Sequence, residues 1–233
     1  MSTLPLDTRV DSVLRSPLFY GIASAECSEI VSIAQERHFA KGETIFRQGD
    51  PVKFTFLLIS GRVKITETSP GGDDVILSMR ASGEVVGGLG LAPNSPHTRT
   101  AQALERCHML VWKAGDFQTL AERYPALALN ASQVLSERLQ VLEERFHELA
   151  TQPVAPRLAR TLVRLLEQNQ DGTREPAPIS LTHEELAQMT GMTSFTVSRL
   201  LSDWEQRGIL ASHRRSVLIK DLLGLRTLAK RAA

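Results

Sequence analysis

The chain has 233 residues, 42% of them apolar and 23% charged, a composition typical of globular proteins with a sizeable core. No basic N-terminal stretch leads into an apolar run, and no segment approaches the roughly 20 apolar residues of a membrane helix, so we expect neither a secretory signal nor a membrane span. Two cysteines, Cys27 and Cys107, are too few for a disulfide framework and favour a cytoplasmic protein. The net charge of +1 is unevenly distributed, with 15 Lys and Arg against 18 Asp and Glu in residues 1–152 but 12 against 8 in residues 153–233.

Residues 7–36 are predicted to form short helices around spaced apolar residues, namely Leu14, Leu18, Ile22, Ile30 and Ile33. From residue 37 to about 113, short apolar stretches such as 55–59, 62–66 and 75–79 are separated by turn signals. These signals are Gly42, Gly49-Asp50-Pro51, Ser60-Gly61, Pro70-Gly71-Gly72 and Ser82-Gly83. Strands at such spacing predict an antiparallel sandwich or barrel.

A long helix is expected from about Pro125 to Thr151. Its apolar residues are spaced by four and three positions, the heptad spacing of a coiled-coil seam, and they are Leu135, Leu139, Leu142, Phe146 and Leu149. Much of the remaining surface is charged, through Glu137, Arg138, Glu143, Glu144, Arg145 and Glu148. A helix packed on its own domain would also need an apolar stripe, but a narrow stripe between charged faces favours a dimer seam. Pro153 then ends the helix and marks a hinge.

The segment after the hinge contains an amphipathic helix over residues 154–168, carrying Leu158, Leu162, Leu165 and Leu166, and then a polar loop from Gln168 to Pro178. Thr182-His183-Glu184-Glu185 matches a capping box, which starts a short helix with Leu186 and Ala187 inward. Thr190-Gly191-Met192 breaks that helix, and Thr193 can cap a second one that buries Val197, Leu200, Leu201 and Trp204 and ends at Gly208. Two helices joined by so short a turn predict a helix-turn-helix.

The predicted second helix turns a mostly polar side outward, made of Ser194, Phe195, Thr196, Ser198 and Arg199. A major groove is wide enough to admit such a helix. Two short strands, 209–212 and 216–219, enclose His213-Arg214-Arg215 as a wing whose arginines can meet phosphate. An ordinary helical hairpin would not need the basic wing, so these features together favour DNA binding. We expect Thr182, His183 and Thr193 to lie at the edges of the DNA interface.

Five segments in this order resemble the CRP/FNR superfamily of bacterial regulators over nearly the whole chain: 41–50, 59–64, 83–91, 99–101 and 181–210. The resemblance implies an α+β protein with an N-terminal antiparallel β-roll of jelly-roll type (1–122), a central dimerisation helix (123–152) and a C-terminal winged helix-turn-helix (153–233). It also implies a homodimer, an activator that contacts RNA polymerase, bound to near-palindromic double-stranded DNA with half-sites roughly 34 Å apart.

Members that bind cyclic AMP hold the ribose through a Gly-Glu pair and the phosphate through an Arg-Ser pair. Here the first pair is Gly87-Gly88, followed by Leu89, so the carboxylate is missing, whereas the second survives as Arg99-Thr100. The positions that face adenine correspond to Leu142 and Glu143. These departures argue against cyclic AMP and predict an anionic or apolar effector, or none. Arg99 is interpreted either as an anion ligand or as part of a surface salt bridge.

No metal site is predicted. Members of the FNR branch hold an iron–sulfur cluster through four cysteines, which this chain does not have. Cys107 and His108 are strand neighbours that point to opposite faces, and Cys107 is expected in the core. Some members bind haem through histidine, and His38, His97, His108 and His147 leave haem as an alternative, as Cys27 leaves a redox-responsive regulator.

Recognition helices of the family commonly carry a Glu and an Arg four residues apart. Arg199 matches the Arg and is expected to contact guanine O6 and N7, a pair worth ~1–3 kcal/mol of discrimination. The Glu position is Phe195, whose ring can contact a thymine methyl unless it packs inside the domain. No nucleophile elbow, metalloprotease motif or phosphate-binding loop occurs in the sequence, so an enzyme is not expected.

Overall fold

The computed structural model of the chain describes residues 4–68, 72, 74–90, 92–168 and 178–230. The chain divides into two compact units, one made of Met1–Gly72 and Leu77–Gln140 and the other of Asp73–Ile76 and Val141–Ala233. The predicted turn at Pro70-Gly71-Gly72 and the predicted loop from Gln168 to Pro178 lie largely outside the described residues. Within the described ranges, no helix has both the length and the apolar character needed to cross a membrane.

The first unit begins with the predicted short helices, α1 (Leu6–Leu14), a 3₁₀ turn η1 (Pro17–Phe19) and α2 (Ser24–Ser32). The hydroxyl of Ser16 accepts a hydrogen bond from the backbone N–H of Leu18 (3.3 Å) and so caps the 3₁₀ turn. The helices bury one apolar face, which includes Val10, Val13, Leu18, Phe19, Cys27 and Ile30.

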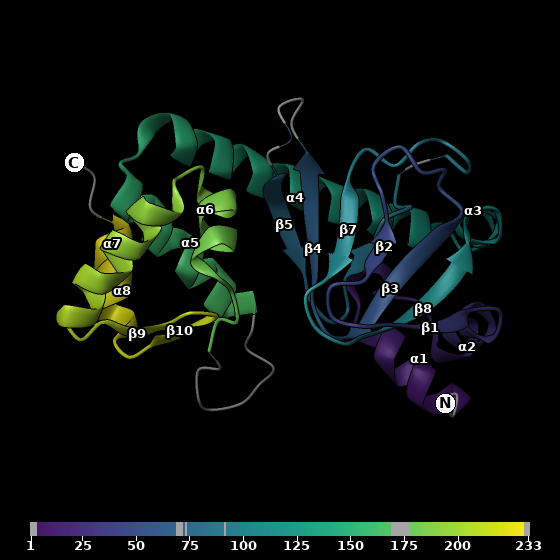
Figure 1. Cartoon of the computed structure of the whole chain (residues 1–233). Coiled ribbons are helices and arrows are strands. Elements are labelled where there is room, and N and C mark those ends of the chain that lie inside the picture. Colours follow the sequence, from purple (N-terminus) through teal and green to yellow (C-terminus); the bar gives the residue numbers. More distant parts are fainter. Residues whose placement is uncertain (1–3, 69–71, 73, 91, 169–177, 231–233) are drawn as a thin grey trace. The chain divides into compact units, whose positions relative to one another are not determined.

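Two four-stranded antiparallel sheets follow, which confirms the predicted β-roll (Figure 1). The first sheet has the order β1-β8-β3-β6, with bounds Gln35–Phe39, Cys107–Lys113, Phe54–Ser60 and Val85–Val86. The second has the order β2-β7-β4-β5, with bounds Thr44–Phe46, Thr100–Ala103, Val63–Thr68 and Asp74–Arg80. Strands remote in sequence are therefore neighbours, and β1 pairs with β8 so that His38 lies opposite His108.

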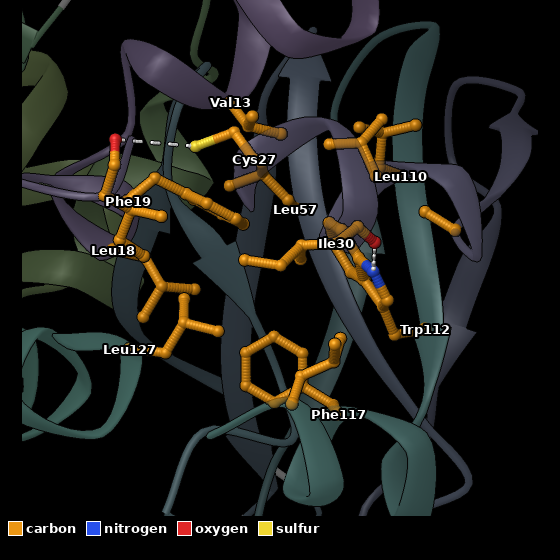
Figure 2. Close-up of a cluster of buried hydrophobic side chains, with 14 of the residues drawn as sticks. Val13, Leu18, Phe19, Cys27, Ile30, Leu57, Leu110, Trp112, Phe117 and Leu127 are labelled. Atoms are coloured by element: carbon orange, nitrogen blue, oxygen red, sulfur yellow. Dashed lines mark hydrogen bonds between the residues drawn. The ribbon is translucent and has the colours of Figure 1, made fainter. Parts of the chain in front are cut away.

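The two faces of the first sheet bury different partners because successive strand residues point to opposite sides. On β8, Leu110 and Trp112 belong to the cluster formed with α1, η1 and α2, where the indole N–H of Trp112 donates to the carbonyl of Ile30 at 2.8 Å (Figure 2). Met109 and Val111 instead join apolar residues of the second sheet. Cys107 faces that same interior, as predicted for a core residue, and is fully buried.

Three helices follow β8, namely α3 (Ala114–Arg123), α4 (Pro125–Thr151) and α5 (Val154–Gln168). The last two have the bounds expected from the apolar periodicity and from Pro153, whereas α3 was not predicted. Leu158, Leu162, Leu165 and Leu166 of α5 are buried, as the amphipathic pattern requires.

The C-terminal part consists of α6 (His183–Thr190), α7 (Ser194–Gln206), the hairpin β9 (Leu210–His213) and β10 (Ser216–Ile219), and α8 (Leu222–Lys230) (Figure 1). The predicted helix pair and wing are confirmed, and α8 is an additional helix. The side chain of Asp221 accepts from the backbone N–H of Gly224 (2.9 Å), which caps the start of α8. The guanidinium of Arg160 on α5 donates to the carbonyl of Ala229 (2.8 Å), so α8 is held against α5.

Candidate functional site

The turn between α6 and α7 has the geometry that the sequence indicated. The hydroxyl of Thr182 accepts from the backbone N–H of Glu185 (3.1 Å), whose carboxylate accepts in return from the N–H of Thr182 (3.0 Å). Gly191 takes φ 63°, a left-handed conformation that side chains rarely adopt. Thr193 caps α7 by accepting from the N–H of Thr196 (3.2 Å). The direction of α7 is therefore fixed by local backbone geometry.

Helix α7 has one buried side and one open side. Val197, Leu201 and Trp204 are at most 1% exposed, and Leu200, expected to be buried, is half-buried. On the open side, the Phe195 side chain is 77% exposed, which excludes internal packing of its ring in this structure. Ser194 and Arg199 are exposed, and Thr196 and Ser198 are half-buried. The exposed apolar ring and the neighbouring guanidinium are thus free to meet a partner.

The wing is tied to both helices by hydrogen bonds to Ser212 of β9. Its hydroxyl contacts Nε2 of His183 (3.0 Å), and its backbone N–H donates to the carboxylate of Glu205 (3.0 Å). Arg214 and Arg215 form the turn between β9 and β10, and both are exposed. Because His183 is half-buried in this contact, its first role is to hold the wing beside α6.

The segment after β6 contains Gly87 and Gly88, which stand where the resemblance places the Gly-Glu pair of members that bind cyclic AMP. Gly88 has φ 73°, and a Cβ added there would lie 2.5 Å from Oγ1 of Thr55 and 3.0 Å from the carbonyl oxygen of Phe54. A Cβ at Gly87 would similarly meet the ring of Phe46 at 2.5 Å. The loop in this conformation has no room for a carboxylate side chain at position 88, and the next residue, Leu89, is buried.

Three arginines gather beside this loop. Arg138 of α4 donates to the carbonyl oxygen of Val85 (2.7 Å), and its Nε is buried without a hydrogen-bond partner among the described residues. The pKa of Arg138 is lowered to about 10, mainly by burial and then by the positive charges of Arg80 and Arg99, with the negative charge of Glu84 opposing the shift. Burial also lowers the pKa of Arg80, against the opposing charge of Glu84 at 3.7 Å. Among the described residues, Glu84 is the carboxylate that partly offsets the positive charge of this cluster.

Of the two residues predicted to bind an anion, Arg99 belongs to this cluster, whereas Thr100 has another partner. Arg99 is exposed, whereas the hydroxyl of Thr100 already accepts from the backbone N–H of Gln48 (3.0 Å). Leu142 and Glu143 are exposed and belong to the second compact unit. Arg80 and Arg138 were missed in the sequence, because each stands in an ordinary polar position and only the fold shows what it faces.

Among the charged residues of α4 that were expected on the solvated surface, Arg145 is half-buried, and Arg138 and Glu148 have partners on other elements. Arg138 is half-buried against β6, as described above. Glu148 is 6% exposed, and its carboxylate accepts two hydrogen bonds from Arg164 of α5, at 2.7 and 3.0 Å, with Arg160 3.8 Å away. The prediction was wrong for Arg138 and Glu148 because each side chain reaches a partner on another element. The Glu148 pairs join α4 and α5 across the hinge at Pro153.

The predicted seam of α4 is open along its length in the single chain. The exposed fractions are 38% for Leu135, 56% for Leu139, 44% for Leu142, 73% for Phe146 and 50% for Leu149. Both ends also contact their own unit, since added Cβ atoms at Gly90 and Gly191 would lie 2.8 Å from Leu135 Cδ1 and 3.3 Å from Leu149 Cδ2. Phe146, the fourth of the five residues, is the most exposed of them.

The two thiols have the environment of structural cysteines. Both are fully buried, and burial raises the pKa of Cys27 and of Cys107, so neither forms a thiolate readily at neutral pH. His97 is likewise buried, with its ring stacked on Phe46 at a centroid distance of 3.8 Å. These contacts account for the three residues as parts of the core.

Comparison with known proteins agrees with both halves of the chain. Residues 36–124 match the family model described as a cyclic nucleotide-binding domain, and residues 156–228 match that of a Crp-like helix-turn-helix domain. The cyclic AMP receptor protein of Thermus thermophilus is 29% identical over 92% of this chain and 97% of its own length. A CRP-like cAMP-activated global transcriptional regulator of Mycobacterium tuberculosis is 27% identical over 91% of this chain and 96% of its own.

The fold also matches solved structures. FixK2 from Bradyrhizobium japonicum superposes with a TM-score of 0.74, covering 86% of this chain and all of that one at 22% identity. At this identity the likeness supports the shared fold, a β-roll, a long helix and a helix-turn-helix.

Proposed function

The chain belongs to the CRP/FNR superfamily of DNA-binding transcription regulators, and on this basis we propose that it acts as a homodimer whose β-roll binds an anionic small molecule other than cyclic AMP. The observation that carries this proposal is the cluster of Arg80, Arg99 and Arg138 beside the Gly87-Gly88 loop. We also propose RNA polymerase as the protein partner, as the resemblance to the family implies.

The arginine cluster favours an anion for electrostatic reasons. Like charges in a half-buried place raise each other's energy, and a bound anion would offset that cost with charge-assisted hydrogen bonds. The unpartnered Nε of Arg138 is one donor that such a ligand can satisfy. Glu84 lies 3.7 Å from Arg80 and also offsets part of the charge of Arg138, so neighbouring arginines share this carboxylate.

The case against cyclic AMP rests on position 88. The curated relatives are named for cyclic AMP, and in family members that bind it a carboxylate takes the ribose hydroxyl. At Gly88, an added side chain would clash with Thr55 and would require a strained backbone. Leu142 and Glu143 stand where adenine contacts are expected and do not reproduce them. An anion without a ribose suits the remaining residues better.

The effector is proposed to act by shifting an equilibrium. Arg138 lies on the helix that also carries the apolar seam, so a ligand held by Arg138 would bias how the two α4 helices of a dimer pack. The spacing of the two α7 helices would follow, and with it the affinity for a two-half-site operator. The ligand changes this equilibrium only by its different affinity for the two states.

Thermal unfolding of the purified protein tests the effector proposal. We expect inorganic phosphate or a small dicarboxylate to raise the Tm of the wild type and to have little effect on the Arg138→Met variant. Arg123→Met is the matched control, because Arg123 is 65% exposed and its guanidinium pairs with a surface carboxylate, that of Glu29. Saturable stabilisation by cyclic AMP at concentrations where phosphate has no effect would contradict the proposal.

A further inference from the structure

We propose that Glu36, His38 and His108 form a binding site for one divalent transition-metal ion, with zinc as the best match. The three residues lie on β1 and β8, apart from both the arginine cluster and the helix-turn-helix. Their ligand atoms all lie within 4.8 Å of one another. The site does not depend on the effector proposed above.

Strand register brings these residues together. His38 and His108 are directly opposite in the antiparallel pair β1–β8, and Glu36 is two residues before His38 on the same face. The two imidazole rings stack at a centroid distance of 4.3 Å with an interplanar angle of 11°. Nε2 of His108 is 2.9 Å from Oε2 of Glu36. Three potential ligands from two strands therefore converge on one point of a rigid sheet.

The carboxylate is held in place from behind. Its other oxygen, Oε1, accepts a hydrogen bond from the backbone N–H of Leu4 (3.0 Å) and lies 3.7 Å from Nε of Arg9. Arg9 is itself anchored through hydrogen bonds to the carbonyl oxygens of Val31 and Ala34, at 2.7 and 2.5 Å. Oε2 is thereby directed at His108. Such secondary contacts are the usual support of a metal-ligating carboxylate.

The chemistry of the donor set selects the class of ion. Two imidazole nitrogens and one carboxylate oxygen suit zinc and neighbouring first-row metals, and are a poor match for Ca²⁺ or Mg²⁺, which prefer all-oxygen sites. With bonds of about 2.0–2.1 Å, two ligands of a tetrahedral ion lie roughly 3.4 Å apart. The observed separation needs only side-chain rotation, chiefly of His38, and the fourth position would be taken by water.

The site is accessible from one side. Glu36 and His108 have side chains that are 5% and 13% exposed, whereas His38 is exposed. His108 continues the row of Leu110 and Trp112, the residues that Figure 2 shows beneath the N-terminal helices. The three residues thus stand at the rim of that helical cover, where an ion can enter by replacing the hydrogen bond between Nε2 of His108 and Oε2 of Glu36.

A purely structural explanation of the cluster is a cross-strand aromatic pair with one histidine–glutamate bond. That explanation accounts for His108 and Glu36, and it gives His38 only the stack of its exposed ring on His108. The two interpretations make different predictions for His38. Its side chain is exposed, so its removal should have a clear effect only if the cluster binds metal.

Calorimetric titration with ZnCl₂ of the full-length, tag-free, chelator-treated protein tests the proposal, with Co²⁺ absorbance as a second readout. We expect one ion per chain, Co²⁺ bands of low-symmetry nitrogen and oxygen coordination, and at least about tenfold weaker binding in His38→Ala and in His108→Gln. His147→Ala is the matched control, since His147 is exposed on α4 outside the cluster, and it should bind zinc like the wild type.

Because His38 is exposed, His38→Ala should keep the Tm of the metal-free protein, so loss of zinc binding cannot come from unfolding. Absence of zinc binding at equimolar concentrations would overturn the proposal. So would zinc binding that is equally strong in the wild type, His38→Ala and His108→Gln.

Discussion

Arg138 on α4 donates a hydrogen bond to the carbonyl oxygen of Val85 on β6, across 2.7 Å, although the two residues are 53 positions apart in the chain. This contact places a charged guanidinium where burial and two other arginines disfavour its charge. It also connects the loop at the candidate effector site to the helix that carries the apolar seam.

Replacement of Arg138 by methionine should raise stability when no anion is present. A pKa of about 10 means that the group stays charged at neutral pH but at a cost, since the unfolded chain holds that proton more tightly. We expect the free energy of unfolding to rise by about 1 kcal/mol in low-salt buffer, after loss of the Val85 hydrogen bond is included. Urea unfolding measures this free energy, with Arg123→Met as the neutral control. A clear destabilisation by Arg138→Met would contradict the prediction.

Replacement of Glu148 by alanine should destabilise the second unit strongly. Arg164 and Arg160 would lose the buried carboxylate that they face, and removing one partner of a buried pair typically costs about 3–5 kcal/mol. The exposed pair of Glu167 and Arg226 offers the control, because both side chains are about half exposed and Glu167→Ala should cost less than about 1 kcal/mol. Equal effects of the two changes in urea unfolding would show that the Glu148 contacts contribute little.

Two glycine substitutions should have opposite signs. Gly191→Ala forces a side chain into φ 63° next to Leu149 and should destabilise by about 1–2 kcal/mol. Gly115→Ala lies in α3 with open space around its Cβ and should stabilise by about 0.5–1 kcal/mol. Thermal unfolding of both variants checks the prediction, and stabilisation by Gly191→Ala would mean that the turn does not need its left-handed residue.

Phe146→Glu should convert a dimer into a monomer. Its ring is 73% exposed in the single chain, the most of any residue in the apolar stripe, so a carboxylate there would be buried in a dimer seam. Leu223→Glu is matched, because Leu223 is 77% exposed but lies on α8. Sedimentation velocity should show monomers for Phe146→Glu only. The same variant should bind its operator about 100-fold more weakly than the wild type. A wild type that is monomeric at all concentrations would refute the seam.

The local parts of this structure follow from sequence patterns. The heptad spacing and Pro153 define α4, and the capping box at Thr182 with Gly191 defines the start and end of α6. These features depend on residues a few positions apart, whose geometry is set by backbone rules. Helix α8 has a signal of the same local kind, an Asp221 cap followed by Leu222, Leu225 and Leu228.

The tertiary parts could not be predicted in the same way. Arg138 and Glu148 have the same helical context as solvated neighbours, and only the opposing elements distinguish them. His38 and His108 are 70 residues apart, and their approach depends on the register of β1 against β8. Sequence spacing carries no information on such register until the strand pairing is known.

On the open side of α7, Arg199 and the 77% exposed Phe195 are the residues that we expect to contact DNA bases. Selection of binding sites from random duplexes tests this expectation most directly, using the wild type, Arg199→Ala and the control Arg207→Ala at the far end of α7, where Arg207 pairs with Asp203. We expect the wild type and Arg207→Ala to select a two-fold symmetric motif with one guanine per half-site. Arg199→Ala should accept any base at that guanine, because it loses about 1–3 kcal/mol of discrimination against the wrong base. An identical motif for all three proteins would contradict the account.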